Sequence, residues 1–219
     1  MKEKNTQFRI KQIESKIKNP KRISLRRKQI IKGAIDVFTV KGFNSATTRE
    51  IALAAGITEG TLFNYVRSKE DIIYIVYEYI TQILRKDMEK AIAGITDPQE
   101  RLKAALLQNM KTIDVYQDII MFMYKESHSL DKESLYTVLA REAGYIEMFE
   151  ELLTAYFGEK KMDPVKIKLA ADLLSYIPVI VTFRRWSLKR RFDSMDAVIS
   201  GILDFILHGI EFAVDMPSL

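Results

Sequence analysis

The sequence lacks most of the side chains that carry out catalysis and bind metal ions. It has no cysteine and only two histidines in 219 residues, His128 and His208, which lie far apart along the chain. Without cysteine there is neither a disulfide nor a thiolate metal site. No Gly-rich phosphate loop, HExxH motif or GxSxG elbow is present. We therefore expect no catalytic residue, no cofactor and no metal ion, and we expect that the protein is not an enzyme.

Long apolar runs are also missing. The longest extends over about residues 176–183, whereas a membrane-spanning helix needs about 20 apolar residues. The N-terminus is charged and has no apolar segment of the kind found in signal peptides. The absence of cysteine suits a reducing compartment without proving one. We predict a cytoplasmic protein that does not interact with a membrane.

Acidic side chains are scarce in the first third of the chain. Residues 1–69 contain 16 lysines and arginines but 5 aspartates and glutamates, a net charge of +11, whereas residues 70–219 hold the other 18 and 24, a net charge of −6. A basic end of this kind favours a polyanionic partner, most simply nucleic acid. The strongly basic segment 1–23 fits a solubilising tail and a DNA-contacting arm equally well.

The chain from residue 24 onwards follows helical periodicity, and no segment alternates convincingly between apolar and polar residues. Ile31, Ala34, Ile35 and Phe38 recur at the spacing of one buried helix face. Gly42 follows at a position where only glycine adopts a left-handed conformation at low cost, which predicts the end of that helix. We therefore predict an all-α fold.

Capping signals divide the remaining sequence into helices and domains. Residues 47, 58, 68, 97 and 163 are predicted N-caps, the last two being followed by proline. We further expect a break near 114–118, a long helix over 131–157, a kink at Pro178, a loop over 187–193 and a last helix over 194–214. The predicted domains are a basic extension (1–23), a helix-turn-helix domain (24–72), and a helical regulatory and dimerisation domain (73–219).

Residues 47–66 read TTREIALAAGITEGTLFNYV. Thr47 and Glu50 have the spacing of a capping box, and Thr58 caps the next helix. Two short capped helices separated by a Gly-Ile-Thr turn form the helix-turn-helix layout, whose second helix lies in the major groove of DNA. The outward face of that helix is small and polar, which lets its backbone approach DNA closely.

The motifs KGFNSATTREIA, GITEGTLFNYV and SKEDI, in this order within residues 24–72, resemble those of the tetracycline-repressor-like (TetR) family of bacterial regulators. Beyond residue 72 only the architecture matches. The resemblance implies an all-helical homodimer in which the fourth helix links a DNA-reading head to a ligand-binding body. It also implies that the last two long helices pair with those of the partner as a four-helix bundle.

The resemblance further implies which residues contact DNA. Thr48, Tyr65 and Lys69 match phosphate-contacting positions, and Arg49 matches a position that can reach a guanine edge. Phe63 departs from the family pattern, because many relatives have a tyrosine there whose hydroxyl binds phosphate. Arg49 could also be simply a solvated helix charge. The predicted DNA-binding residues are Thr48, Arg49, Gly60, Thr61, Asn64, Tyr65 and Lys69.

The last helix is apolar around most of its circumference, so it needs two buried sides. One side can face its own domain, and the other needs a partner, although a monomeric core could also explain the pattern. We predict a homodimer interface. Its predicted residues are Leu173, Ile177, Ile202, Phe205 and Ile206.

The middle helices are rich in methionine and aromatic residues, which occur in cores more often but also suit adaptable ligand cavities. The predicted ligand-pocket residues are Met110, Phe122, Met123, Tyr145, Phe149 and Tyr176. The basic run around Trp186 is either a solvated loop or an anion-binding rim for an acidic group of the ligand.

These observations favour a ligand-responsive transcriptional regulator, a repressor released from a palindromic double-stranded operator by a small apolar or aromatic molecule. One alternative is a DNA-binding activator or nucleoid-associated protein without a small ligand. Another is a helical ligand-binding or adaptor module that does not bind DNA. The sequence names neither the ligand nor the operator.

Overall fold

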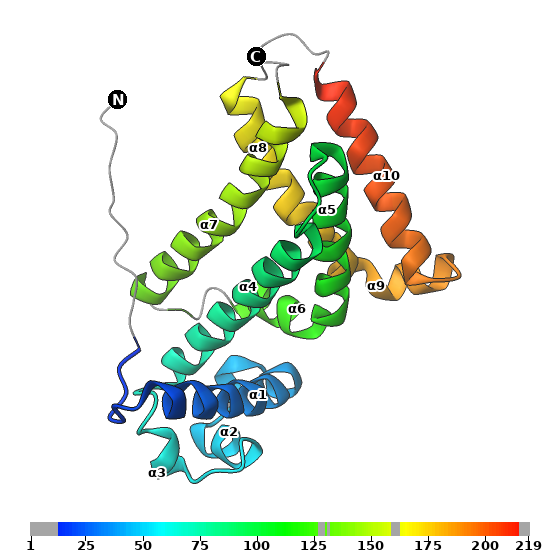
Figure 1. Cartoon of the computed structure of the whole chain (residues 1–219). Coiled ribbons are helices and arrows are strands. Elements are labelled where there is room, and N and C mark those ends of the chain that lie inside the picture. The colour runs from blue at the N-terminus through cyan, green and yellow to red at the C-terminus, as the bar shows by residue number, and fades with distance from the viewer. Residues whose placement is uncertain (1–12, 127–129, 131, 159–162, 215–219) are drawn as a thin grey trace. The chain divides into compact units, whose positions relative to one another are not determined.

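The computed structural model describes residues 13–126, 130, 132–158 and 163–214 (Figure 1). These residues form helices and connecting loops without a strand, so the predicted all-α fold is confirmed. The helices are α1 (Pro20–Ser45), α2 (Thr48–Ala54), α3 (Glu59–Leu62), α4 (Lys69–Ile92), α5 (Pro98–Val115), α6 (Gln117–Glu126), α7 (Lys132–Phe157), α8 (Pro164–Tyr176), the short 3₁₀ helix η2 (Ile177–Val179), α9 (Ile180–Arg191) and α10 (Met195–Val214).

The helices form two compact units, each of which is discontinuous in sequence. The head unit consists of the described residues within 13–81 and 121–142, and the body unit consists of those within 82–120 and 143–214. The predicted domain boundary at residue 72 therefore lies within α4, which continues without interruption from Lys69 to Ile92.

Side-chain caps begin the helices where the sequence predicts them. Thr47 accepts a hydrogen bond from the Glu50 amide, and Glu50 accepts one from the Thr47 amide, which completes the capping box. Thr58 caps α3, Asp97 caps α5 and Asp163 caps α8. These predictions are confirmed because an N-cap depends only on a short stretch of local sequence.

Two predicted helix boundaries are wrong. Helix α1 starts at Pro20 rather than at residue 24, with Asn19 as its cap; proline suits the first helical position because its missing amide has no partner there. Helix α9 runs through the predicted loop to Arg191, and the three basic residues in its last turn are favourable beside the negative end of the helix dipole. The predicted kink at Pro178 is present as η2.

Each unit has its own apolar core. In the head unit, Ile30, Ala34 and Phe38 form the buried face of α1, while Ile35 is half-buried. In the body unit, the core joins α4, α5, α7, α8 and α10; its fully buried members are Met88, Leu102, Ala105, Leu106, Met110, Phe149, Leu153 and Ala171. Within the described ranges, no helix has both the length and the apolar character needed to cross a bilayer.

Candidate nucleic-acid interface

Helices α1 and α2 cross at backbone contact because residue 33 is glycine. A Cβ atom at Gly33 would lie 2.6 Å from the backbone nitrogen of Ala55 and 2.9 Å from the carbonyl oxygen of Ile51. Both neighbours are backbone atoms, so no side-chain rotation could make room. Gly33 therefore sets how closely α2, and with it the start of the helix-turn-helix, packs on α1.

The N-terminus of α2 is fixed by more than its capping box. The Lys41 ammonium donates a 2.6 Å hydrogen bond to the Glu50 carboxylate, which also accepts from the Thr47 amide. The hydrogen bond from Lys41, followed by those from Thr47, lowers the pKa of Glu50 to about 2. Glu50 is therefore ionised at neutral pH, and its negative charge is favourable in the first turn of α2.

Helix α3 is a single turn held between a cap and the core. The Thr58 hydroxyl accepts from the Thr61 amide at 3.2 Å and lies 2.9 Å from the Thr61 hydroxyl. Leu62 is fully buried, whereas Gly60 is exposed with open space around the position of a Cβ. One side of α3 is thus anchored, and its other side presents backbone and small polar groups outward.

A side-chain hydrogen bond joins α2 and α3. The Thr48 hydroxyl donates to the Glu59 carboxylate at 2.5 Å, and both residues are half-buried. Arg49, beside Thr48, is exposed, and Thr61 and Asn64 are half-buried. The structure therefore brings five of the seven predicted DNA-binding residues together on α2, α3 and the turn after it (Figure 1).

Two other predicted contacts lie differently from the expectation. Tyr65 is 1% exposed, so its assignment as a phosphate contact is corrected: the turn after α3 points this ring into the core of the head unit. The Lys69 ammonium donates to the carbonyls of Phe43, Asn44 and Ala46 at 2.8, 3.3 and 3.0 Å and lies 4.4 Å from the centre of the Phe43 ring. Lys69 therefore ties the start of α4 to the last turn of α1 and to its C-cap residue, Ala46.

Sequence reasoning did not single out Gly33 and Lys41. A glycine within the apolar stripe of a helix is a signal for close packing, since it otherwise costs about 1 kcal/mol relative to alanine. Lys41 gave no such signal, because its pairing with Glu50 depends on how α1 turns into α2.

The six predicted pocket residues are divided between the two units. Met110, Tyr145 and Phe149 lie together in the core of the body unit, with the Tyr145 and Phe149 rings edge to face at 5.3 Å. Phe122 belongs to the head unit, where it stacks on Phe38 at 5.1 Å; the neighbouring Met123 carbonyl accepts a hydrogen bond from Tyr77. Tyr176 is half-exposed on α8.

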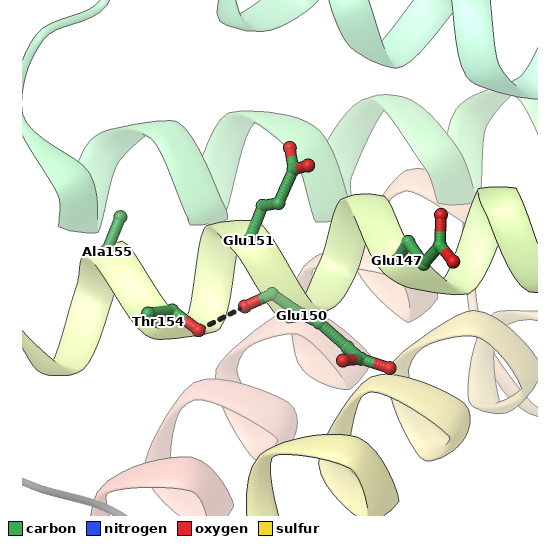
Figure 2. Close-up of a pocket in the computed structure, with 5 residues that line it drawn as sticks. All are labelled: Glu147, Glu150, Glu151, Thr154 and Ala155. Carbon is green, nitrogen blue, oxygen red and sulfur yellow. Dashed lines mark hydrogen bonds between the residues drawn. The ribbon is translucent and has the colours of Figure 1, made fainter. Parts of the chain in front are cut away.

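A surface hollow of about 540 Å³ lies along α7 in the body unit (Figure 2). It is lined by Glu147, Glu150, Glu151, Thr154 and Ala155, and the Thr154 hydroxyl donates to the Glu150 carbonyl at 2.7 Å. Three carboxylates on one helix face do not suit an apolar ligand. The hollow contains none of the predicted pocket residues.

Two of the five predicted dimer residues are exposed, and two others are half-buried against the core of the body unit. Phe205 is 75% exposed on α10 and Leu173 is 50% exposed on α8, while Ile177 and Ile202 are half-buried. The assignment of Ile206 is corrected. It is buried with Ile199 and Leu203 in the core of its own body unit, because these residues recur every three or four positions on the inner face of α10.

Comparisons with known proteins agree with this geometry. Residues 30–74 match the family model described as bacterial regulatory proteins, tetR family. The chain is 25% identical over 191 residues to the HTH-type transcriptional regulator HbdR of Aromatoleum sp. (strain CIB), covering 87% of this chain and 83% of that protein.

Two solved structures share the fold. FadR from Bacillus subtilis in complex with stearoyl-CoA superposes with a TM-score of 0.69 at 19% identity, covering 82% of this chain and 96% of that chain. AibR in complex with isovaleryl coenzyme A and operator DNA gives a TM-score of 0.65 at 17% identity, covering 82% and 97%.

Proposed function

The chain belongs to the TetR family of bacterial regulatory proteins, and from this premise we propose that it is a cytoplasmic repressor whose homodimer binds a palindromic operator and is released by an acyl-coenzyme A thioester. The proposal that the protein binds DNA is supported by the geometry of α2 and α3. Leu62 and Gly33 hold the two helices on the core, and Gly60 and Thr61 leave the outer side of α3 open for the major groove.

Operator selection tests this part directly. Wild-type protein is used to select duplexes from a random pool, and binding is then measured by a mobility shift. We expect a palindromic sequence, and we expect Thr61→Ala/Asn64→Ala to lose most of the preference for it. Equal operator binding by wild type and this double variant would contradict the assignment of α3 as the recognition helix. Binding to no duplex at all would favour the adaptor alternative.

The homodimer rests on an apolar surface of α8 and α10. Val165, Leu169 and Leu173 recur at helical spacing on α8 and are 66%, 53% and 50% exposed, and Phe205 on α10 is 75% exposed. We take these exposed apolar side chains as the interface, because large exposed apolar surfaces mark sites of protein–protein interaction. A second copy of the chain is the partner that gives two identical heads, one for each half of a palindrome.

The apolar part of the ligand fits the body core around Asn109. Asn109 on α5 is fully buried; its Oδ1 accepts from the Tyr145 hydroxyl at 2.6 Å, while its Nδ2 has no hydrogen-bond partner in the part of the chain that the structure describes. A buried amide group without a partner costs about 1–3 kcal/mol. We propose that it donates to the thioester carbonyl oxygen of an acyl-coenzyme A, with the acyl chain among core residues such as Met110 and Phe149.

The anionic part of the ligand fits the basic end of α9. Arg184, Lys189, Arg190 and Arg191 are exposed, whereas Arg185 forms a largely buried ion pair with Asp114 of α5. This pair fixes α9 against α5 within the body unit, and the neighbouring cations remain available for phosphates. The stearoyl- and isovaleryl-coenzyme A complexes of the two similar proteins support the same class of ligand.

Operator release tests the ligand. Long-chain acyl-coenzyme A should raise the melting temperature and release the operator, whereas coenzyme A alone should do neither. Asn109→Leu should require roughly fivefold more ligand, the equivalent of one hydrogen bond of about 1 kcal/mol. Gln108→Leu is the matched control, because that amide already donates to Thr112. If both variants respond like wild type, Asn109 does not contact the ligand; if no acyl-coenzyme A acts, the ligand class is wrong.

A further inference from the structure

The segment before α1 is attached to the turn that follows the recognition helix. We call residues 13–19 the N-terminal strap. The Lys16 amide and the Ser15 hydroxyl both donate to the carbonyl of Asn64, each at 2.9 Å. Ser15 also accepts from the Ile17 amide at 3.1 Å, which closes a local turn in the strap. The strap therefore has a defined position beside a residue predicted to face DNA.

A partly buried arginine holds the start of the strap. Arg27 of α1 donates to the carbonyl of Ile13 at 2.5 Å and to that of Tyr65 at 3.3 Å, so it bridges the strap and the turn after α3. Burial lowers the pKa of Arg27, in spite of nearby acidic groups. Glu14 pairs with Arg67, the next residue but one after Tyr65. An unattached solubilising tail would not require these contacts.

We propose that the strap is a second DNA-contacting element, in which Lys16 and Lys18 bind phosphates that flank the bases facing α3. The proposal rests on the DNA-binding function of the head unit. The Lys16 amide itself makes the bond to the Asn64 carbonyl, and Lys18 lies two residues further on; both lysines are exposed. The strap thus adds positive charge next to α3, whose own surface is nearly neutral.

The positive charge of the strap identifies DNA as its binding partner. On α3 and its cap the only charged side chain is that of Glu59, which faces Thr48. The strap and the first turn of α1 supply the exposed cations Lys16, Lys18, Lys21 and Arg22, and the one acidic residue among them, Glu14, is paired with Arg67. Phosphate contacts provide affinity and register, while base contacts provide sequence preference. The strap therefore provides phosphate contacts, and α3 provides base contacts.

Salt-dependent binding of the full-length protein tests the strap. Fluorescence anisotropy measures the affinity for the selected operator and for a random duplex over a series of KCl concentrations. Lys16→Gln/Lys18→Gln should weaken both duplexes alike and lower the slope of log affinity against log salt by about 1.8 per protomer, since each phosphate contact contributes about 0.9. Lys103→Gln/Lys111→Gln, which removes the same charge from two exposed positions of α5, is the control and should leave the slope unchanged.

A neutral variant separates position from charge. Ser15→Ala keeps every lysine but removes one hydrogen bond to Asn64 and the local turn, so it should weaken operator binding severalfold. If Lys16→Gln/Lys18→Gln keeps the wild-type salt dependence, or if Ser15→Ala keeps the wild-type operator affinity, the proposal that the strap contacts DNA is wrong. The Thr61→Ala/Asn64→Ala variant keeps the two proposals apart, because its loss of operator preference supports the DNA-binding function even where the strap variants have no effect.

Discussion

Replacing Gly33 with alanine should lower the stability of the head unit, although alanine is the better helix former. The helix propensity of alanine favours the substitution by about 1 kcal/mol. Against this, the new methyl group would lie 2.6, 2.9 and 3.0 Å from three backbone atoms of α2 and its C-cap residue, Ala55. Overpacking of a rigid core costs about 1–3 kcal/mol, and here the closest contact requires α1 and α2 to separate. The balance of these two effects ranges from zero to a loss of about 2 kcal/mol in the free energy of unfolding, and we expect about 1–2 kcal/mol because the neighbouring atoms belong to the backbone and cannot rotate away.

Thermal unfolding followed by circular dichroism measures this effect, with an expected decrease in Tm of about 2–8 °C for a chain of this length. Gly144→Ala is the matched control, because a Cβ there meets no atom within 4 Å, and it should raise Tm slightly. Operator affinity should fall for Gly33→Ala and stay unchanged for Gly144→Ala, since only the former moves α2. A Gly33→Ala protein that melts at or above the wild-type temperature would refute the close-packing argument.

Three further substitutions address single contacts. The pKa of Glu50, about 2, lies below its ordinary value of 4.5, so the ionised carboxylate stabilises the fold above pH 4.5, and this contribution disappears as the pH falls to 2. Urea unfolding at several pH values should therefore show that the difference in stability between wild type and Glu50→Gln decreases between pH 4.5 and 2. Lys69→Ala should lower the free energy of unfolding in urea by about 2 kcal/mol, because three carbonyls lose a charged donor. A change in the salt dependence of DNA binding without a loss of stability would instead show that Lys69 contacts a DNA phosphate. Phe205→Glu should give folded monomers in sedimentation velocity, and an unchanged dimer would place the interface elsewhere.

The features that could be predicted from the sequence are those that depend on neighbours along the chain. The capping residues Thr47, Thr58 and Asp97 located the starts of α2, α3 and α5 because a cap bonds to an amide two or three residues away. The glycine at residue 42 has φ of +74°, as expected for a residue that ends the regular part of α1.

Features that depend on tertiary approach could not be predicted. Phe205 and Ile206 are adjacent and both apolar, yet Ile206 is buried and Phe205 is exposed, and the packing of the body unit decides between them. Tyr65 lies in the turn after α3, where no helical periodicity predicts the direction of its ring. The basic end of α9 has the composition of a solvated loop, yet the Arg185–Asp114 pair and the helix dipole keep it helical. Likewise, nothing local to Asn64 indicates that its carbonyl binds a segment 48 residues earlier.

The contacts of Arg27 also bear on how the head can be exchanged between proteins. In a chimera that joins this head to a foreign ligand-sensing domain, the start of α1 is the simplest place to begin the head. A cut at Pro20 would remove the Ile13 carbonyl that accepts from Arg27 and the Ser15 and Lys16 groups that bond to Asn64. A transplantable reading module from this protein should therefore begin no later than Ile13.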